Sequence, residues 1–234
     1  MLVTAGARGL GLATGRAFQS AGARVHVGWR SAGPGLEGVR DEFGGRLHRA
    51  DLACPGAASG LVEGVLEQEG RLDVLVHTVG AFRAGSLQEA RGEDLAAAFE
   101  SNVTTSFHAF NAARTALRTT RGSALFFGVA GLERLRGRRE TALYAASKSA
   151  LLVLVRSWAL EEAPHGVRVN SISPGLVPHE HADPGTHDPA RHARVPLGRA
   201  GRPEEVARAA VFLCSDASSY TTGVDLPVAG GWLA

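Results

Sequence analysis

Short apolar runs alternate with longer segments of helical periodicity along the whole chain of 234 residues. The apolar runs are rich in Val, Leu and Phe and are bounded by glycine or polar residues, which is typical of strands. Strands are predicted at residues 1–4, 23–29, 45–50, 72–77, 123–127, 167–172 and 224–228. Helices are predicted at residues 9–21, 36–43, 55–69, 93–119 and 141–162, and a last one begins at residue 203.

Strands that alternate with helices predict a parallel sheet with helices on both faces. We therefore expect an α/β fold, a Rossmann-type doubly wound sheet of seven strands in a single domain over residues 1–234. Gly22 is expected to end the first helix and Pro55 to open the third. Residues 178–196 hold four Pro, four His and no apolar period, which predicts a mobile lid over about residues 176–200.

Composition narrows the class of protein. The net charge of +2 comes from scattered arginines that acidic residues nearly balance, so we expect no nucleic-acid partner. The longest apolar run, residues 150–155, is too short to cross a bilayer, and no signal peptide precedes the first strand, so we expect a cytoplasmic protein without a membrane partner. Cys54 and Cys214 are expected to be free thiols, with a single disulfide as the alternative.

Lys148 is the only lysine in the chain and follows Tyr144 by four residues. Residues four apart share one face of a helix, so the phenol and the ammonium group can act on one ligand. Lysine differs from arginine in having a compact ammonium group whose pKa moves on burial. The pair therefore predicts a site that arginine cannot serve, and the alternative is a surface lysine near a packed tyrosine.

A glycine-rich turn, Thr4-Ala5-Gly6-Ala7-Arg8-Gly9-Leu10-Gly11, joins the first predicted strand to the first helix. Glycines there let the backbone approach a pyrophosphate, and the positive end of the helix dipole favours its charge. This context, strand then turn then helix, predicts a dinucleotide site. The alternative is a tight turn that binds nothing.

Together, the turn and the Tyr144–Lys148 pair resemble the short-chain dehydrogenase/reductase family over essentially the whole chain. Thr4, Gly9 and Gly11 match the family's turn, whereas its first glycine is Ala5 here, beside Gly6. The segments that follow the family's pattern further along are Asp51-Leu52, Ser101-Asn102-Val103, Ser173-Pro174-Gly175, and residues 196–199, 203–207, 212–216, 222–223 and 230–231.

The resemblance implies roles for particular residues. Tyr144 would give its proton to a carbonyl oxygen as hydride arrives, Lys148 would lower the pKa of that phenol and hold the nicotinamide ribose, and Asn102 would belong to a proton-relay site. The residues implied to bind the cofactor are Thr4, Gly6, Arg8, Gly9, Leu10, Gly11, Trp29, Arg30, Ser31, Asp51, Leu52, His77, Val79, Gly80, Tyr144, Lys148, Pro174, Gly175 and Val177.

The end of the second predicted strand bears on the choice of nicotinamide cofactor. NAD-preferring relatives carry an Asp there that binds the ribose 2′-hydroxyl, whereas this chain has Trp29, Arg30 and Ser31. Arg30 and Arg8 could clamp a 2′-phosphate from two sides, since guanidinium groups suit phosphate. We expect NADP(H) to be preferred, with NAD(H) possible; the alternative is that both arginines are solvated surface residues.

The chain departs from the family at the substrate side. The family's catalytic Ser, which follows the fifth strand, is Gly128 here, and the spacing from there to Tyr144 is longer than usual. The glycine could leave room for a bulky substrate or a water, or another donor could replace the hydroxyl. Val129 and Thr141 are further candidates for substrate contact. His77 stands where the family has Asn and could add a polar group, although a lone His at a strand end is more often structural.

Two charged segments flank this region. The loop before the catalytic helix holds four arginines, Arg134, Arg136, Arg138 and Arg139. They could bind an anionic substrate or a carrier-protein arm, but a solvated loop or a subunit contact is the simpler interpretation. The lid holds His179, His181, His187 and His192 with Asp183 and Asp188. Their spacing suits no ordinary structural zinc site, so we expect no metal.

Three functions remain open from the sequence. The first is an NADPH-dependent oxidoreductase of the EC 1.1.1 type that reduces ketones or oxidises alcohols, on a small-molecule substrate that could be carrier-bound. The second is a non-redox enzyme of the same fold, a dehydratase, isomerase or cyclase, which Gly128 favours. The third is a catalytically silent cofactor-binding subunit. The resemblance also implies a homo-oligomer, a tetramer or dimer built on the long helices.

Overall fold

The computed structural model describes residues 1–33, 35–134, 136–179, 182 and 184–232. Within them one sheet of seven parallel strands runs in the order β3-β2-β1-β4-β5-β6-β7, which confirms the predicted topology. The strands are β1 (Leu2–Val3), β2 (His26–Trp29), β3 (Leu47–Arg49), β4 (Val74–His77), β5 (Ser123–Phe127), β6 (Arg168–Pro174) and β7 (Asp225–Val228). The pairing register places Val3 opposite both Val27 and Val76.

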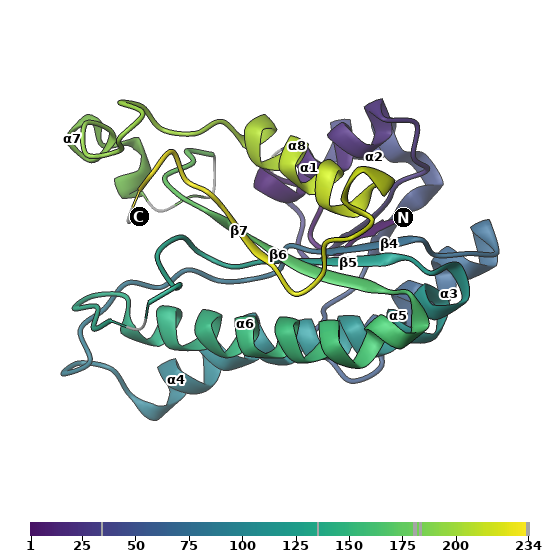
Figure 1. Cartoon of the computed structure of the whole chain (residues 1–234), viewed down its shortest axis with the longest axis horizontal. Helices are drawn as coiled ribbons and strands as arrows, with labels where there is room; N and C mark the ends of the chain where they lie inside the picture. Colours follow the sequence, from purple (N-terminus) through teal and green to yellow (C-terminus); the bar gives the residue numbers. More distant parts are fainter. Residues whose placement is uncertain (34, 135, 180–181, 183, 233–234) are drawn as a thin grey trace.

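Helices cover both faces of this sheet (Figure 1). One face carries α1 (Gly9–Ser20), α2 (Leu36–Phe43) and α8 (Pro203–Cys214). The other carries α3 (Ala57–Glu69), α4 (Gly92–Phe99), α5 (Thr105–Thr120) and α6 (Ala142–Glu162). A short helix, α7 (Pro189–His192), lies in the segment between β6 and α8.

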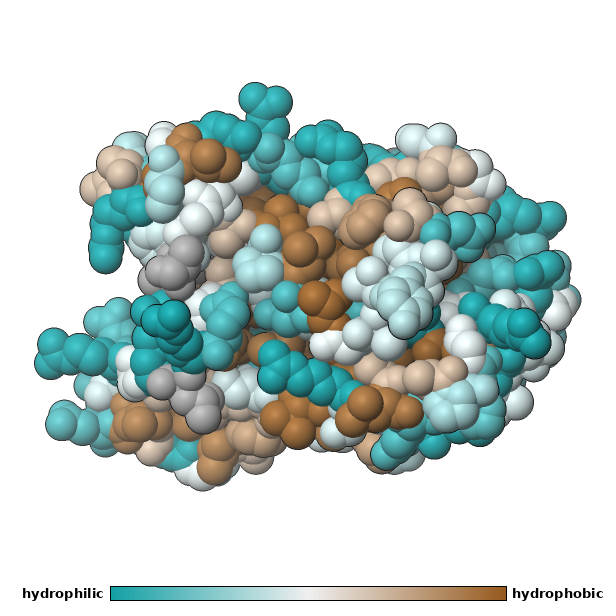
Figure 2. Space-filling view, viewed as in Figure 1, coloured by the Kyte–Doolittle hydropathy of each residue, from teal (hydrophilic) through white to brown (hydrophobic). Residues whose placement is uncertain are grey.

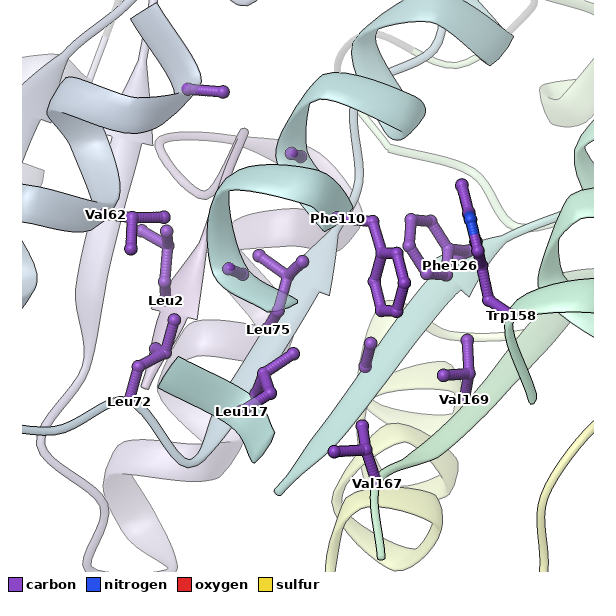
Figure 3. Close-up of a cluster of buried hydrophobic side chains, with 14 of the residues drawn as sticks. Leu2, Val62, Leu72, Leu75, Phe110, Leu117, Phe126, Trp158, Val167 and Val169 are labelled. Atoms are coloured by element: carbon purple, nitrogen blue, oxygen red, sulfur yellow. The ribbon is translucent and has the colours of Figure 1, made fainter. Parts of the chain in front are cut away.

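Each face has its own hydrophobic core. Between the sheet and helices α3, α5 and α6, three aromatic side chains meet, as Figure 3 shows for Phe110, Phe126 and Trp158. The ring centroids of Phe110 and Trp158 are 4.6 Å apart, and those of Phe126 and Trp158 are 5.2 Å apart. Aromatic pairs at such distances add packing energy beyond the area that they bury. This cluster fixes α6 against β5.

Helix α6 is the long apolar helix of the chain. With the residues that follow it, to His165, it has the length and composition that a membrane-spanning helix would need. Its side chains Leu151, Val155 and Trp158 are nonetheless buried against the sheet. A core helix meets the same criteria of length and composition, and we assign α6 to the core.

Two helix predictions need correction. Pro55 does not open the third helix, because α3 begins at Ala57 after Gly56, whose φ of +79° belongs to the left-handed region. The helix predicted over residues 93–119 is interrupted at Glu100–Thr104 by a π-helical segment, η2. Extra residues in a helical turn shift the phase of the side chains, and such bulges are frequent at functional sites.

The parallel strands bring their carboxyl ends to one edge of the sheet. The chain order reverses there, since β1 leads to β2 on one side and has β4 as its neighbour on the other. Ligands of open α/β sheets bind outside the carboxyl ends of the strands at such a switch point. The amino end of α6 lies at this edge, and the space-filling view is hollowed there, at the left of Figure 2.

Candidate active site

Glycines shape the turn between β1 and α1. Gly9 has a φ of +53°. A Cβ at Gly11 would stand 2.7 Å from the Oγ1 atom of Thr78 and would collide with the carbonyl of Ala5. Only glycine allows this close approach of the backbone. Arg8, the N-cap residue of α1, is exposed and its side chain forms no cap, so the first N–H groups of α1 are left for a ligand.

The other predicted residues of the turn have less exposed positions. Thr4 and Gly6 are buried, and the Gly6 amide donates to the carbonyl of Gly28 at 3.1 Å. Leu10 is half-buried and packs against the core beneath the turn. Thr4, Gly6 and Leu10 therefore form the side of the turn that faces the core.

The end of β2 is more basic than the sequence indicated. Trp29 is flanked by two guanidinium groups, with the Cζ atoms of Arg40 and Arg49 at 5.5 Å and 5.6 Å from its ring centroid. Arg30 and Ser31, which follow β2, are exposed. Sequence reasoning missed Arg40 and Arg49 because they lie on α2 and β3, and only the fold brings them to Trp29.

Asp51 and Leu52 follow β3. The Oδ1 atom of Asp51 accepts a hydrogen bond from the Ala53 amide at 3.2 Å. The backbone carbonyl of Asp51 accepts one from the Cys54 amide at 2.9 Å. Asp51 is half-buried and Leu52 is buried in the core. The side chain of Asp51 thus stabilises its own turn, and its contact with an adenine ring stays a prediction.

His77, the last residue of β4, is a structural residue. Its Nδ1 atom lies 3.0 Å from Oγ1 of Thr4, and its Nε2 atom lies 3.3 Å from Oγ1 of Thr105. The Thr105 hydroxyl already donates to the carbonyl of Ser101, so it can only accept, and Nε2 carries the proton while Nδ1 accepts from Thr4. Burial, with a smaller effect of the Lys148 charge, lowers the pKa of His77 to about 3. Its ring is neutral and fully engaged, and we withdraw the expectation that it contacts a ligand.

The π-helical segment η2 delivers Asn102 to the end of β4. Its Nδ2 atom donates to the carbonyls of Ala98 and Ala81 at 3.0 Å and 3.3 Å. Its Oδ1 atom is buried and accepts no hydrogen bond from any residue that the structure describes. A Cβ at Gly80 would stand 2.6 Å from this oxygen and 2.8 Å from Nζ of Lys148. Both polar atoms therefore lie against the position that a Cβ of residue 80 would occupy, which requires glycine there.

The neighbouring residues of the β4 loop differ in exposure. Val79 is half-buried and packs against the core, whereas Gly80 is exposed. The Oγ1 atom of Thr78 is buried and has no hydrogen-bond partner among the described residues. Since an unpaired buried hydroxyl costs free energy, Thr78 and Asn102 both point to a polar ligand at this edge.

Tyr144 and Lys148 lie one turn apart at the amino end of α6, on one face. The Nζ atom of Lys148 is 5.9 Å from the centroid of the Tyr144 ring and donates to the carbonyl of Phe127 at 2.6 Å. Lys148 is buried, with 3% of its surface exposed. The ring of Phe82 packs edge-on against Tyr144 at 5.1 Å between centroids.

The charges of this pair differ from the expectation. Burial raises the pKa of Tyr144 to about 12, and burial lowers the pKa of Lys148 to about 8. The charge of Arg138 has a smaller effect that lowers the pKa of the phenol. That Lys148 acidifies Tyr144 stays a prediction; in this structure the ammonium group donates to the Phe127 carbonyl and is itself desolvated.

Gly128 does not open a hole beside the site. A Cβ at this position would stand 2.5 Å from Oγ of Ser173 and 3.4 Å from Cδ2 of Leu152. The Ser173 hydroxyl is fully buried and donates to Asp225, with oxygen distances of 2.8 Å and 2.9 Å. The idea that Gly128 leaves room for a bulky substrate is therefore incorrect. Sequence reasoning missed Ser173 and Asp225 because they come from β6 and β7.

The two further substrate candidates, Val129 and Thr141, are both partly exposed. Val129 is half-buried in the segment after β5. Thr141 is the N-cap residue of α6, and its carbonyl accepts from the Ala145 amide at 2.8 Å. Neither residue is sealed in the core, so both keep their role as candidates.

The segment after β6 approaches the dinucleotide turn. Pro174 ends β6, and a Cβ at Gly175 would stand 2.7 Å from Cα of Ala229, so the backbones of β6 and of the residues after β7 are in contact. Val177 is buried in the core. The ring of His179 lies against Gly9, with Nδ1 3.1 Å from where a Cβ would stand. His179 is thus the lid histidine placed at the glycine turn, which the sequence gave no signal for.

Two hydrogen bonds hold described residues further along the lid. Asp188 caps α7 through the Ala190 amide at 2.9 Å, and His192 Nε2 lies 2.6 Å from the carbonyl of Thr186. His181 and Asp183 lie outside the described residues. Among the residues described, no group of three or more His, Cys, Asp and Glu side chains is arranged to hold a metal ion, and Cys54 and Cys214 are free thiols.

A doubly wound sheet with a glycine-rich turn after β1 and a Tyr–Lys pair at its carboxyl edge defines a dinucleotide-binding α/β protein. A family model described as enoyl-(acyl carrier protein) reductase matches residues 4–233. The chain belongs to the short-chain dehydrogenase/reductase family, a family of oxidoreductases, as the sequence predicted. Its curated relatives include enzymes that act on different substrates.

L-Fucose dehydrogenase of Mus musculus is 33% identical, covering 99% of this chain and 87% of the relative. The 3-oxoacyl-(acyl carrier protein) reductase of Thermotoga maritima is 32% identical and covers 98% and 96%. Among solved structures, a short-chain dehydrogenase/reductase from Serratia marcescens has a TM-score of 0.90 at 30% identity, covering 100% of this chain and 97% of that one. A blue fluorescent protein from a metagenomic library, in complex with NADPH, has a TM-score of 0.88 at 30% identity with the same coverage.

Proposed function

We propose that the protein is an NADPH-dependent carbonyl reductase, able to work as an alcohol dehydrogenase in reverse, with Tyr144 as proton donor. The observation that carries the proposal is the arrangement of Tyr144, Lys148 and Asn102 at the carboxyl edge of β4 and β5. A buried ammonium group and an unpaired amide oxygen there flank Gly80, one turn of helix from a phenol. The chain is similar to a 3-oxoacyl-(acyl carrier protein) reductase and to a cyclopentanol dehydrogenase, and this similarity supports the same chemistry.

The residues present fit a dinucleotide. Gly11 and Gly80 hold the backbone open where a side chain would collide, and the Thr78 hydroxyl is buried without a partner among the described residues. The amino end of α1, Arg8 and His179 would take the pyrophosphate, and Asp51 and Leu52 would lie toward the adenine. Pro174, Gly175 and Val177 would lie toward the nicotinamide, which when bound supplies or accepts hydride.

The preference for NADPH follows from charge at the end of β2. Arg30 is exposed and follows Trp29, and the guanidinium groups of Arg40 and Arg49 lie over the ring of Trp29, so three guanidinium groups gather where relatives with NAD carry a carboxylate. Arg8 adds a fourth from the glycine turn. Guanidinium groups bind phosphate through charge-assisted hydrogen bonds, which favours a ribose 2′-phosphate over a hydroxyl.

The side chains of the site would divide the proton chemistry among them. Tyr144 gives its proton to the carbonyl oxygen of the substrate, and burial among apolar groups keeps the phenol protonated until that step. Lys148 has its pKa lowered to about 8, so it can pass a proton to the phenolate near neutral pH. The Asn102 oxygen is placed to hold a water beside the ammonium group, which would reconnect the pair to solvent.

A second candidate function is supported by Gly128. A site without the usual hydroxyl at this position would suit acid–base chemistry in which Tyr144 and Lys148 act without hydride transfer, such as dehydration or isomerisation. A silent cofactor-binding subunit is the third possibility from the sequence, and no feature of the site favours it.

One assay separates these functions. The purified chain is incubated with NADPH and a panel holding a 3-oxoacyl thioester, a cyclic ketone and a sugar lactone, and cofactor oxidation is followed by its absorbance. Ketone-dependent oxidation that Tyr144→Phe abolishes and Tyr220→Phe leaves intact supports the proposal, because Tyr220 is fully exposed. Turnover of substrate without cofactor oxidation would support the second candidate, and undiminished turnover in Tyr144→Phe would remove Tyr144 as proton donor.

We further propose that the protein is a cytoplasmic homo-oligomer. Val153 and Leu160 on α6 are 62% and 80% exposed, and Phe107 on α5 is 45% exposed. Figure 2 shows apolar surface along the edge where α6 lies. Pairing of these two helices with their copies would cover this surface. Light scattering that gives the mass of a monomer at micromolar concentration would contradict it.

A further inference from the structure

The loop between β4 and α4 is held by hydrogen bonds at two points beside the amino end of α6 (Figure 1). The Ala81 amide donates to Oγ of Ser101 at 2.8 Å, and the Ala81 carbonyl accepts from Nδ2 of Asn102 at 3.3 Å. Four residues further on, the Gly85 amide donates to the carbonyl of Glu140 at 2.6 Å. The first two bonds tie the loop to η2, and the third ties it to the loop that leads into α6. The residues from Ala81 to Gly85 therefore form a bridge whose place is fixed at both ends.

Phe82 is the aromatic residue of this bridge, and its ring lies against Tyr144. The two ring centroids are 5.1 Å apart and the ring planes are inclined by 73°, which is an edge-to-face arrangement. Because both polar backbone groups of the preceding residue, Ala81, are bonded to η2, the bridge sets the position of the ring. Phe82 keeps 41% of its surface exposed. A ring that packs edge-to-face on one partner thus has surface left for a third group.

The position of Phe82 bears on what a substrate would meet beside the phenol. A substrate whose carbonyl oxygen accepts from Tyr144 brings the groups bonded to that carbonyl close to the ring that contacts Tyr144. An apolar ring on the substrate would stack on Phe82 and leave water, and both effects favour binding. A hydroxyl-rich group would lose its water there without replacement, because an aromatic ring offers no strong hydrogen bond and the polar backbone groups of Ala81 and the Gly85 amide are already bonded. The bridge therefore favours an apolar substituent.

We propose that Phe82 is a specificity-determining residue: its ring forms one wall of the substrate site and selects ketones, or the corresponding secondary alcohols, whose carbonyl carbon carries an aromatic or alicyclic ring. The inference rests on the proposed function, because it takes Tyr144 as the group that meets the substrate oxygen, and it deepens that proposal by naming the substrate class. Burial raises the pKa of Tyr144 to about 12, which agrees with apolar neighbours around the phenol. Phe82 gives and takes no proton, so its loss changes the choice of substrate and leaves the proton transfer to Tyr144.

A binding measurement tests this wall without turnover. In the presence of NADP⁺ a ketone can bind but finds no hydride, and fluorotyrosine labelling gives one fluorine NMR signal each for Tyr144 and the fully exposed Tyr220. The signal of Tyr144 is the one that Tyr144→Phe removes. Acetophenone, which carries an aromatic ring, is expected to shift the Tyr144 signal in a saturable way and to leave that of Tyr220 in place. Octan-2-one, a linear ketone with the same number of carbon atoms, is expected to bind about tenfold more weakly.

Variants of Phe82 separate the role of its ring from that of its volume. Phe82→Ala is expected to weaken binding of acetophenone by about tenfold and that of octan-2-one by less than about threefold, because the aromatic surface is lost. Phe82→Leu keeps apolar volume and should also lower the preference for acetophenone, whereas Phe82→Tyr keeps the ring and should retain that preference. Phe212→Ala truncates a phenylalanine on α8 that is 46% exposed, and as the matched control it should bind both ketones as the parent does. Circular dichroism shows whether each variant is folded.

These outcomes decide the inference separately from the proposed function. The inference is overturned by the absence of a saturable shift of the Tyr144 signal with acetophenone, by equal affinities of the parent for the two ketones, or by equal losses for both ketones in Phe82→Ala. If NADPH-dependent reduction is observed, the ratio of kcat/KM for acetophenone to that for octan-2-one should fall about tenfold in Phe82→Ala and stay at the parent value in Phe82→Tyr. If no ketone is reduced, the proposed function fails, while the shift of the Tyr144 signal still tests the wall formed by Phe82.

Discussion

The hydroxyl oxygen of Ser173 lies 2.5 Å from the place where a Cβ of residue 128 would stand. Asp225 holds that hydroxyl from the adjoining strand, and Ser171 donates to the same carboxylate at 2.7 Å. A glycine at the usual serine position is thus matched by a buried serine on the next strand. The floor of the site is filled from β6, so reintroducing a side chain at 128 would not simply restore the family's arrangement.

Gly128→Ala should therefore destabilise the protein. Its methyl group meets the Ser173 hydroxyl, and such overpacking costs about 1–3 kcal/mol of the free energy of unfolding. Combined with Ser173→Ala, it should cost less than the sum of the two single changes, because the colliding oxygen is gone. Urea unfolding of the parent, the two single variants and the double variant gives the coupling free energy between positions 128 and 173. Gly137→Ala is the control, because a Cβ at Gly137 would meet no atom within 4 Å. Additive costs would show that the two positions do not compete for the same volume.

The neutral state of His77 predicts how stability changes with pH. Its pKa is about 3 in the folded chain and about 6.5 in the unfolded chain, so between these values the unfolded chain binds one more proton. Stability is then complete above about pH 6.5 and falls by up to about 1.4 kcal/mol per pH unit on acidification toward pH 3. His77→Gln can still donate to Thr105 and accept from Thr4. It should reduce the slope of the unfolding free energy against pH by the contribution of one proton.

Urea unfolding between pH 4 and pH 8 measures that slope, within the range set by a folded pKa of about 3 and an ordinary value of 6.5. His26 and His48 also have a pKa lowered by burial, so part of the acid sensitivity should survive in His77→Gln. The exposed His165→Gln is the matched control and should follow the parent curve. A parent-like slope in His77→Gln would mean that His77 takes up a proton in the folded state.

Lys148 can be observed directly because it is the only lysine of the chain. In a sample labelled with carbon-13 at lysine, one side-chain signal should titrate with a midpoint near 8 rather than at the ordinary pKa of 10.5. Burial of the ammonium group, 3% of whose residue surface is exposed, is the physical cause. A midpoint near the ordinary value would show that the group is solvated in solution.

The basic cluster around Trp29 predicts a change in cofactor preference. Arg30→Asp should weaken NADPH binding by about tenfold to hundredfold, since a charge-assisted hydrogen bond to phosphate is lost and a repulsion is added. NADH binding should be unchanged or stronger. Fluorescence titration with both cofactors measures the ratio of dissociation constants, and Arg208→Asp, an exposed arginine on α8, is the control for net charge. An unchanged ratio in Arg30→Asp would disprove the clamp.

Local sequence pattern was enough for the order of the elements and for most of their bounds. The apolar alternation predicted seven strands, and α2 begins and ends where its periodicity indicated. The π-helical segment at Asn102 could not be predicted, because it arises where α5 must pack on the sheet while Asn102 reaches the loop after β4. Likewise, Gly56 rather than Pro55 precedes α3, since the backbone there needs a positive φ.

The Tyr144–Lys148 pair and the glycine turn were recognisable from spacing, because both are set by residues a few positions apart on one element. The sequence by itself determined the family, the sheet and the identity of the residues at its carboxyl edge. Only the tertiary structure decided how these groups are packed and charged: Ser173 fills the space at Gly128, and burial keeps His77 neutral and lowers the pKa of Lys148. Burial and contacts between distant strands set these properties, and neither is encoded in local spacing.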